Sequence, residues 1–203
     1  MSSIKVHKDN FFVTSDIHFF HNNIIKYCNR PWADIDKMTE GIIKNWNEVV
    51  TRESDSVFII GDLAMGGKNR GPELSSVLRH LNGQKYLIPG NHDTYVLKDL
   101  DCLQQINILD RLQEVTVIGD GGEKQKFVMC HYAMKIWNLS HQGSIHLYGH
   151  SHGMMPKDYS TKSMDVGLDT KDANYRPYSY EQIMNLMSIH RQEPVDHHDS
   201  STR

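Results

Sequence analysis

The sequence of 203 residues contains no apolar run that approaches the roughly 18 residues needed to cross a membrane, and its first residues form no long apolar signal segment. Its three cysteines, Cys28, Cys102 and Cys130, are odd in number and form no Cys-x-x-Cys pair. This argues against a disulfide framework and against a thiolate zinc site. We therefore expect a cytoplasmic protein without a membrane partner.

The chain also has no excess of positive charge. Its 22 Lys and Arg residues oppose 25 Asp and Glu residues, and the charges are scattered along the sequence. This balance argues against the binding of long nucleic acids or anionic lipids. Histidine, in contrast, is abundant, with 13 residues. Imidazole binds metals and transfers protons near neutral pH, so this abundance suggests one of those two chemistries without deciding between them.

Short apolar runs alternate with helical patterns in the first half of the chain, and strands joined by hairpins dominate the second half. The predicted helices cover residues 36–50, with Asp36 as the N-cap, 72–81, 94–100 and 179–189. The predicted strands cover residues 10–15, 57–60, 86–88, 112–118, 125–130, 145–148 and 164–168. This order predicts an α/β layered domain with a mixed sheet or a two-sheet sandwich. We expect a single domain over residues 1–190 and a polar, disordered tail over residues 191–203.

Polar residues of metal-binding types follow five of the apolar strands. Because the carboxyl ends of strands in α/β sheets border the crevice where ligands bind, these groups are expected to converge on one site. A single Asp-x-His or Gly-Asp pair is more often a turn, but five such groups in one chain favour a common function. They are Asp16-Ile17-His18, Gly61-Asp62, Gly90-Asn91-His92-Asp93, His131 and Gly149-His150-Ser151-His152.

In this order, the five groups resemble the motifs of the calcineurin-like metallophosphoesterase superfamily. The segments Cys28-Asn29-Arg30-Pro31 and Asp165-Val166-Gly167-Leu168-Asp169 are similar to those of its small single-domain bacterial and phage members. The resemblance implies a four-layer α-β-β-α sandwich of two mixed β-sheets flanked by helices, with two metal ions at one edge.

The resemblance also implies which residues hold the two ions. At the positions that hold the first ion stand Asp16, His18, Asp62 and His152. Asp62 would bridge to the second ion, whose other ligand positions are occupied by Asn91, His131 and His150. Nitrogen and oxygen donors without a thiolate favour Mn, Fe, Ni, Co or Zn over thiophilic metals. We expect two divalent ions, with manganese first among these metals.

Four further residues are candidates for roles in the reaction. The resemblance implies that His92 protonates the leaving oxygen, which an imidazole beside two cations can do if a nearby acceptor supports its protonated form. Asp93 is a candidate for that support, or alternatively for the N-cap of the helix over residues 94–100. His21 and Arg30 are candidate substrate contacts, and the alternative for each is an ordinary loop residue.

The resemblance implies phosphoester hydrolysis by direct attack of a metal-bridging hydroxide. Protein phosphatases of the superfamily carry an Arg after Gly-Asp and another before Gly-Asn-His, and both are missing here around Gly61-Asp62-Leu63 and Pro89-Gly90. The chain also has no basic stripe that would suit a nuclease. We expect a phosphodiesterase acting on small, nucleotide-like phosphoesters. The alternatives are a phosphomonoesterase or a scaffold protein without activity, and the oligomeric state stays open.

Overall fold

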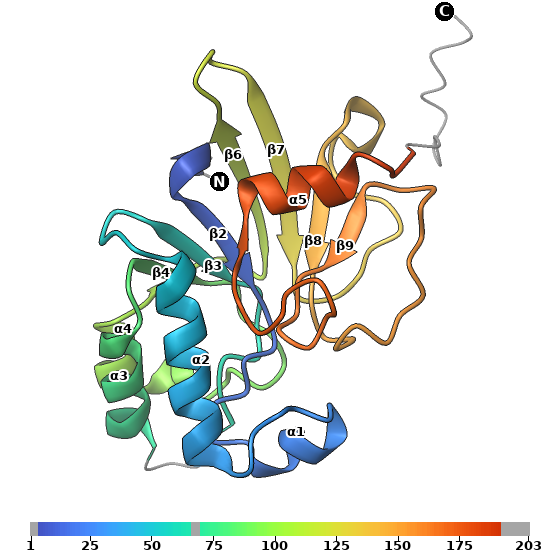
Figure 1. The fold of residues 1–203 in the computed structure, drawn as a ribbon. Helices are drawn as coiled ribbons and strands as arrows, with labels where there is room; N and C mark the ends of the chain where they lie inside the picture. Colours follow the sequence, from blue (N-terminus) through green and yellow to red (C-terminus); the bar gives the residue numbers. More distant parts are fainter. Residues whose placement is uncertain (1–3, 66–69, 192–203) are drawn as a thin grey trace, which may run out of the picture.

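The computed structural model describes residues 4–65 and 70–191, which form two five-stranded sheets (Figure 1). The first sheet contains, in spatial order, β1 (Ile4–His7), β6 (Leu112–Ile118), β7 (Lys124–Cys130), β8 (Ile145–Tyr148) and β9 (Ser163–Asp165). The second contains β10 (Tyr178–Ser179), β2 (Phe11–Thr14), β3 (Ser56–Ile59), β4 (Gln84–Leu87) and β5 (Asn107–Ile108). Each sheet is mixed, because β6 and β7 pair antiparallel in the first sheet, as do β10 and β2 in the second.

The helices flank these sheets. They are α1 (Asn22–Tyr27), α2 (Ile35–Val49), α3 (Gly71–His80), α4 (Leu100–Leu103) and α5 (Tyr180–Met187), with short 3-10 turns at η1 (Lys8–Asn10), η2 (Val96–Lys98) and η3 (Ser140–Gln142). In Figure 1, α2 and α3 lie beside the sheet that contains β2 to β4, whereas α5 lies across β7 to β9. The predicted fold class, two mixed sheets flanked by helices, is confirmed. No helix in the described ranges is both long and apolar enough to cross a bilayer.

Strand β2 supplies both apolar cores, because successive side chains of a strand point to opposite faces. Phe11 lies between the sheets, where its ring stacks on that of Phe127 from β7 at 5.0 Å. Helix α5 joins this same core, since the ring of Tyr180 lies 6.2 Å from that of Phe127. Phe12 points the other way, toward the core that α2 and α3 form with the second sheet. Here Trp46 is 1% exposed and its Nε1 donates to the carbonyl of Asn82 at 3.0 Å.

Several predicted elements differ from the observed ones in their details. Helix α2 begins one residue early, and its N-cap is Asp34, whose side chain accepts from the N–H of Lys37, so Asp36 lies in the first turn. The helix predicted over residues 94–100 is replaced by η2 and the short α4. The edge strands β1, β5 and β10 were not predicted, because short edge strands lack the apolar runs that mark central ones.

The hairpin of β6 and β7 and the capping box of α5, in which Ser179 and Gln182 bond reciprocally, are confirmed. Of the tail predicted over residues 191–203, only Arg191 lies within the described residues.

Replacement of Trp46 by Ala should lower the free energy of unfolding by about 3–5 kcal/mol, because it empties the core between α2 and the sheet. Urea denaturation followed by circular dichroism would measure this loss. The matched control is Ile43→Ala on the same helix, where the side chain is only partly buried. Equal losses for the two variants would contradict the conclusion that Trp46 fills the centre of this core.

Candidate metal centre

Polar residues from both sheets meet at one edge of the sandwich. The segment after β2 lies against the segment after β8, where the N–H of His150 donates to Asp16 Oδ2 at 2.9 Å. The segment after β3 lies against the end of β7, where His131 Nε2 is 3.4 Å from Asp62 Oδ2. The convergence expected from the sequence is therefore present in the fold.

These residues form two groups of potential ligands. We call Asp16, His18 and His152 the first cluster, since one ligand atom from each lies within 4.8 Å of the others. The second cluster, defined by the same distance, is Asp62, His131 and His150. The two clusters adjoin, because Asp62 Oδ2 lies 3.6 Å from His18 Nε2 as well as 3.4 Å from His131 Nε2.

Asn91 completes the set of seven residues that were expected to hold metals. Its Oδ1 lies 3.1 Å from His131 Nε2, beside the second cluster. Asp62 stands between the clusters, where one carboxylate is within reach of both. The structure thus brings together all seven residues, with Asp62 between the two clusters.

Burial within the first cluster indicates that a cation belongs there. His18 is 2% exposed, yet neither of its ring nitrogens has a hydrogen-bond partner. Burying such groups unpaired is costly, and a metal ion would satisfy them. Burial also lowers the pKa of His18 to about 3, so that its imidazole is a neutral ligand. Burial raises the pKa of Asp16 to about 7, because the charged carboxylate is poorly solvated there. The donor set therefore fits a divalent metal.

Five of the expected ligand residues have a left-handed backbone, which was not predicted from the sequence. Their φ angles lie between 49° and 68°, in the order of the chain at Asp16, His18, Asp62, His150 and His152. Asp and His tolerate this region better than most residues, but each instance is expected to cost about 1–3 kcal/mol. Such strain persists only where the surrounding structure enforces it, and it concentrates at functional sites.

Arg30 enforces the geometry of the first cluster from behind. Its guanidinium donates to the backbone carbonyls of Asp16 and Ile17, both at 2.7 Å, and to both carboxylate oxygens of Asp169 at 2.7 and 2.8 Å. Asp169 Oδ2 in turn lies 2.7 Å from His152 Nδ1. Although burial alone would lower the pKa of His152, this hydrogen bond raises it to about 10. A carboxylate behind a histidine fixes its ring and turns the other nitrogen toward the metal.

The expectation that Arg30 contacts substrate is therefore wrong. Its side chain is 0% exposed, and its donors are occupied by Asp16, Ile17, Asp169 and the sulfur of Met38. Asp169 was not predicted as a site residue. It belongs to a segment that supports the family resemblance, but the sequence does not show that it lies behind His152 in the fold.

Asp93 plays neither of the roles considered for it. Its buried carboxylate accepts from the backbone N–H groups of Asp62 and Leu63, both at 2.9 Å, and of Gly90 at 2.8 Å. Within the described part of the chain, its carboxylate forms no hydrogen bond or ion pair with the His92 ring and does not cap a helix. Asp93 instead ties the segment after β4 to the segment after β3. The assignment of Asp93 as a catalytic residue is corrected accordingly.

Gly90, in the same segment, occupies a position that has no space for a side chain. A side chain there would collide with Asp62 Oδ1. The second cluster is also held by the backbone, since His131 Nδ1 lies 2.8 Å from the carbonyl of Ile60 and its Nε2 is thereby turned toward Asp62.

His92 and His21 lie at the edge of the centre. The His92 side chain is 41% exposed and its Nε2 lies 3.9 Å from Asp62 Oδ2. The ring of His21 lies 5.4 Å from that of His18, and its Nδ1 is buried without a hydrogen-bond partner. The ring of His21 thus lies beside the first cluster, and its contact with substrate stays a prediction.

Comparisons with known proteins agree with this arrangement. The family model described as calcineurin-like phosphoesterase matches residues 10–154. An uncharacterized protein of Methanocaldococcus jannaschii, MJ1445, is 33% identical over 179 residues, which cover 87% of this chain and 90% of that protein. The Gene 66 protein of Mycobacterium phage D29 is 30% identical over 79% of this chain and 88% of its own length. A crystal structure of a protein of unknown function from Aquifex aeolicus, AQ665, resembles the fold with a TM-score of 0.62 at 21% identity, over 87% of this chain and 98% of that one.

Replacement of Asp169 by Asn should weaken metal binding about 10–100-fold, because the amide holds the His152 ring less firmly and leaves Arg30 without its counter-charge. Isothermal titration with Mn²⁺ and metal analysis of the purified protein would measure this loss. The control is Asp172→Asn, three residues further on, whose carboxylate pairs with Lys157 near the surface. Unchanged metal affinity in the Asp169 variant would contradict the positioning role.

Proposed function

Because the chain belongs to the calcineurin-like phosphoesterase family, we propose that it is a metal-dependent phosphodiesterase acting on small, nucleotide-like phosphoesters. Family membership supports the coarser activity, the hydrolysis of phosphoesters. The observation that carries the proposal is the pair of adjoining clusters with Asp62 between them.

Each cluster would hold one divalent ion. Bound there, the ions would neutralise the phosphoryl oxygens and make a water molecule acidic enough to react near neutral pH. The carboxylates of Asp16 and Asp62 supply two negative charges against the four positive charges of two such ions, so a net positive charge is left to attract phosphate. Every donor in the two clusters is nitrogen or oxygen, which suits Mn, Fe, Ni, Co or Zn, and we propose manganese as the first of these to test.

His92 is the proposed proton donor to the leaving oxygen. Its backbone N–H donates to Asp62 Oδ1 at 3.0 Å, which fixes the residue beside the centre. Its ring is much more exposed than those of His18 and His131. An exposed imidazole at the edge of a buried centre can reach a bound phosphoester and exchange protons with solvent. These contacts support a role in proton transfer and not in holding the ions.

The preference for diesters is tested with two aryl esters that share a leaving group, bis(4-nitrophenyl) phosphate and 4-nitrophenyl phosphate. The expected result is a higher kcat/KM for the diester in the presence of Mn²⁺. A higher value for the monoester would instead establish a phosphomonoesterase. Absence of turnover with Mn, Fe, Ni, Co and Zn alike would favour a scaffold protein and overturn the proposal.

Replacement of His92 by Ala should leave metal content unchanged and reduce kcat by about 10²–10⁴-fold, the usual contribution of a positioned general acid. Steady-state kinetics with a nucleotide diester whose leaving group is an alkoxide, which needs a proton to depart, together with metal analysis, would measure both quantities. His80→Ala, on the exposed end of α3, is the control for the loss of a histidine. Loss of metal from the His92 variant would show that this residue is a ligand and that the assignment is wrong.

A further inference from the structure

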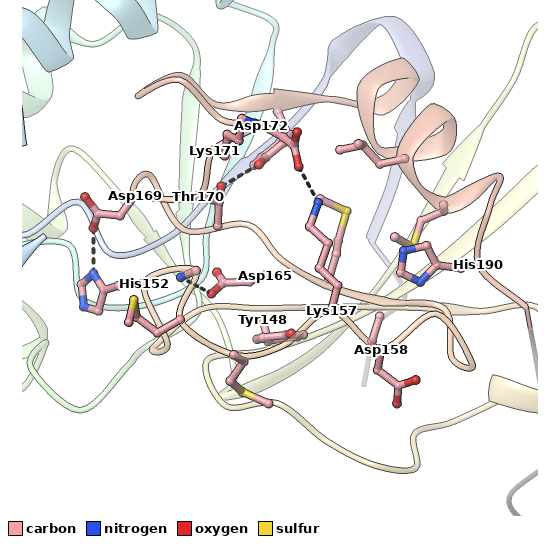
Figure 2. Close-up of a pocket in the computed structure, with 18 of the residues that line it drawn as sticks. Tyr148, His152, Lys157, Asp158, Asp165, Asp169, Thr170, Lys171, Asp172 and His190 are labelled. Carbon is pink, nitrogen blue, oxygen red and sulfur yellow. Dashed lines mark hydrogen bonds and ion pairs between the residues drawn. The ribbon is translucent and has the colours of Figure 1, made fainter.

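A cavity of about 480 Å³ lies beside the first cluster. Figure 2 shows it extending from His152 and Asp169 at one end, past Tyr148 and Lys157, toward His190. His152 thus belongs both to the candidate metal centre and to the wall of the cavity. Through His152, this space adjoins the first cluster. The volume lies within the range of about 300–1,000 Å³ that is typical of pockets for small organic molecules.

The cavity gathers much of the exposed apolar surface of the protein. Nine large apolar side chains are exposed among the described residues, and five of the nine line this cavity: Tyr27, Met154, Met155, Tyr159 and Ile189. Such clustering on a monomer marks a binding surface more often than chance exposure. Aromatic rings provide flat surfaces, and methionine adapts its shape to a ligand. The lining is therefore suited to a ring-bearing organic group.

The charges of the lining do not suit a second phosphate. Its four carboxylates, Asp158, Asp165, Asp169 and Asp172, outnumber its two lysines, Lys157 and Lys171. Of the two histidines in the lining, His152 and His190, the first is bonded to Asp169. One of the two lysines, Lys157, is already paired with Asp172 at 2.9 Å. A second phosphate would need a cluster of free cations, and the lining lacks one within the described chain.

We propose that this cavity is the specificity pocket of the enzyme and that it receives the organic substituent of the substrate, an uncharged, ring-bearing group of about nucleoside size. The substrate class is accordingly a phosphoester with one anionic phosphate, at the metal centre, and no second phosphate on the substituent. This inference rests on the proposed function, because it assumes that the phosphoester lies at the two clusters.

Three esters with the same 4-nitrophenolate leaving group test the proposal. They are methyl 4-nitrophenyl phosphate, thymidine 5′-(4-nitrophenyl phosphate) and the latter with an additional 3′-phosphate. The thymidine ester should exceed the methyl ester in kcat/KM by at least about tenfold, the order of discrimination that an apolar pocket provides. The additional 3′-phosphate should abolish that advantage. Equal values for the methyl and thymidine esters, or a preference for the 3′-phosphorylated ester, would overturn the proposal.

Two variants test whether the preference for the thymidine ester arises from the cavity. Met155→Asp and Ile189→Asp each put a carboxylate on an exposed part of the lining, so the fold should tolerate them, and each should remove the preference for the thymidine ester. Leu112→Asp is the matched control, because Leu112 is 42% exposed, close to the 48% of Met155, but lies outside the cavity. Met155→Leu should restore the preference. Thermal unfolding of each variant would check that it is folded.

Binding of thymidine itself separates this proposal from the proposed function, because thymidine has no phosphoester to hydrolyse. Saturation-transfer NMR on the metal-loaded protein should detect thymidine, and Met155→Asp should weaken the signal while Leu112→Asp leaves it unchanged. Hydrolysis of all three esters without thymidine binding would overturn the pocket but not the activity. Absence of hydrolysis of every ester would overturn the proposed function, and with it the role of the cavity in substrate selection.

Discussion

Asp16 and His18 are buried at the edge of the sandwich, and the ring nitrogens of His18 have no hydrogen-bond partner among the described residues. Much of the surrounding structure compensates for this burial. The N–H of His150 donates to the carboxylate of Asp16, and the guanidinium of Arg30 donates to its backbone carbonyl. Neither group supplies a partner to the His18 ring. A protein that buries such groups and strains its backbone to do so gains stability when a cation binds, because the cation interacts with the folded state alone.

The sandwich provides the rigidity that this arrangement needs. Phe11 of β2 and Phe127 of β7 join the two sheets, and both strands lead directly into the centre. Ligands that follow buried strands are held more firmly than ligands on free loops. The substrate cavity differs from this design, since Met154, Met155 and Tyr159 belong to the long connection between β8 and β9. The chemistry is thus placed on the rigid part of the fold and the selection of substrate on a connecting segment, where sequence can vary at little cost to the sandwich.

The apolar runs and the polar groups that follow them were sufficient to predict an α/β layered domain with a common site. The four-layer sandwich and the seven ligand candidates came from the resemblance of these groups to the motifs of the family. The sequence did not reveal the structural role of Arg30. Its motif places Arg30 in a loop, whereas in the fold its guanidinium is surrounded by backbone carbonyls and the Asp169 carboxylate. The prediction for Asp93 was wrong for a related reason. A carboxylate next to a histidine suggests a partnership, whereas in the fold the nearest unsatisfied donors are backbone N–H groups of a neighbouring segment. The cavity could not be predicted at all, since its walls come from α1, the 150–172 region and the end of α5.

The ion pair of Arg30 and Asp169 joins residues 139 positions apart in the chain. During synthesis, Arg30, Asp16 and His18 leave the ribosome long before His152 and Asp169 do. A growing chain therefore carries incomplete ligand sets until nearly the whole domain has been made, and closing so long a loop is among the later events in folding. If Asp169 positions His152 as predicted, full metal affinity would arise only when this long-range contact forms. The same pair that aligns the centre in the finished protein would then delay high-affinity capture of metal until the fold around the site is assembled.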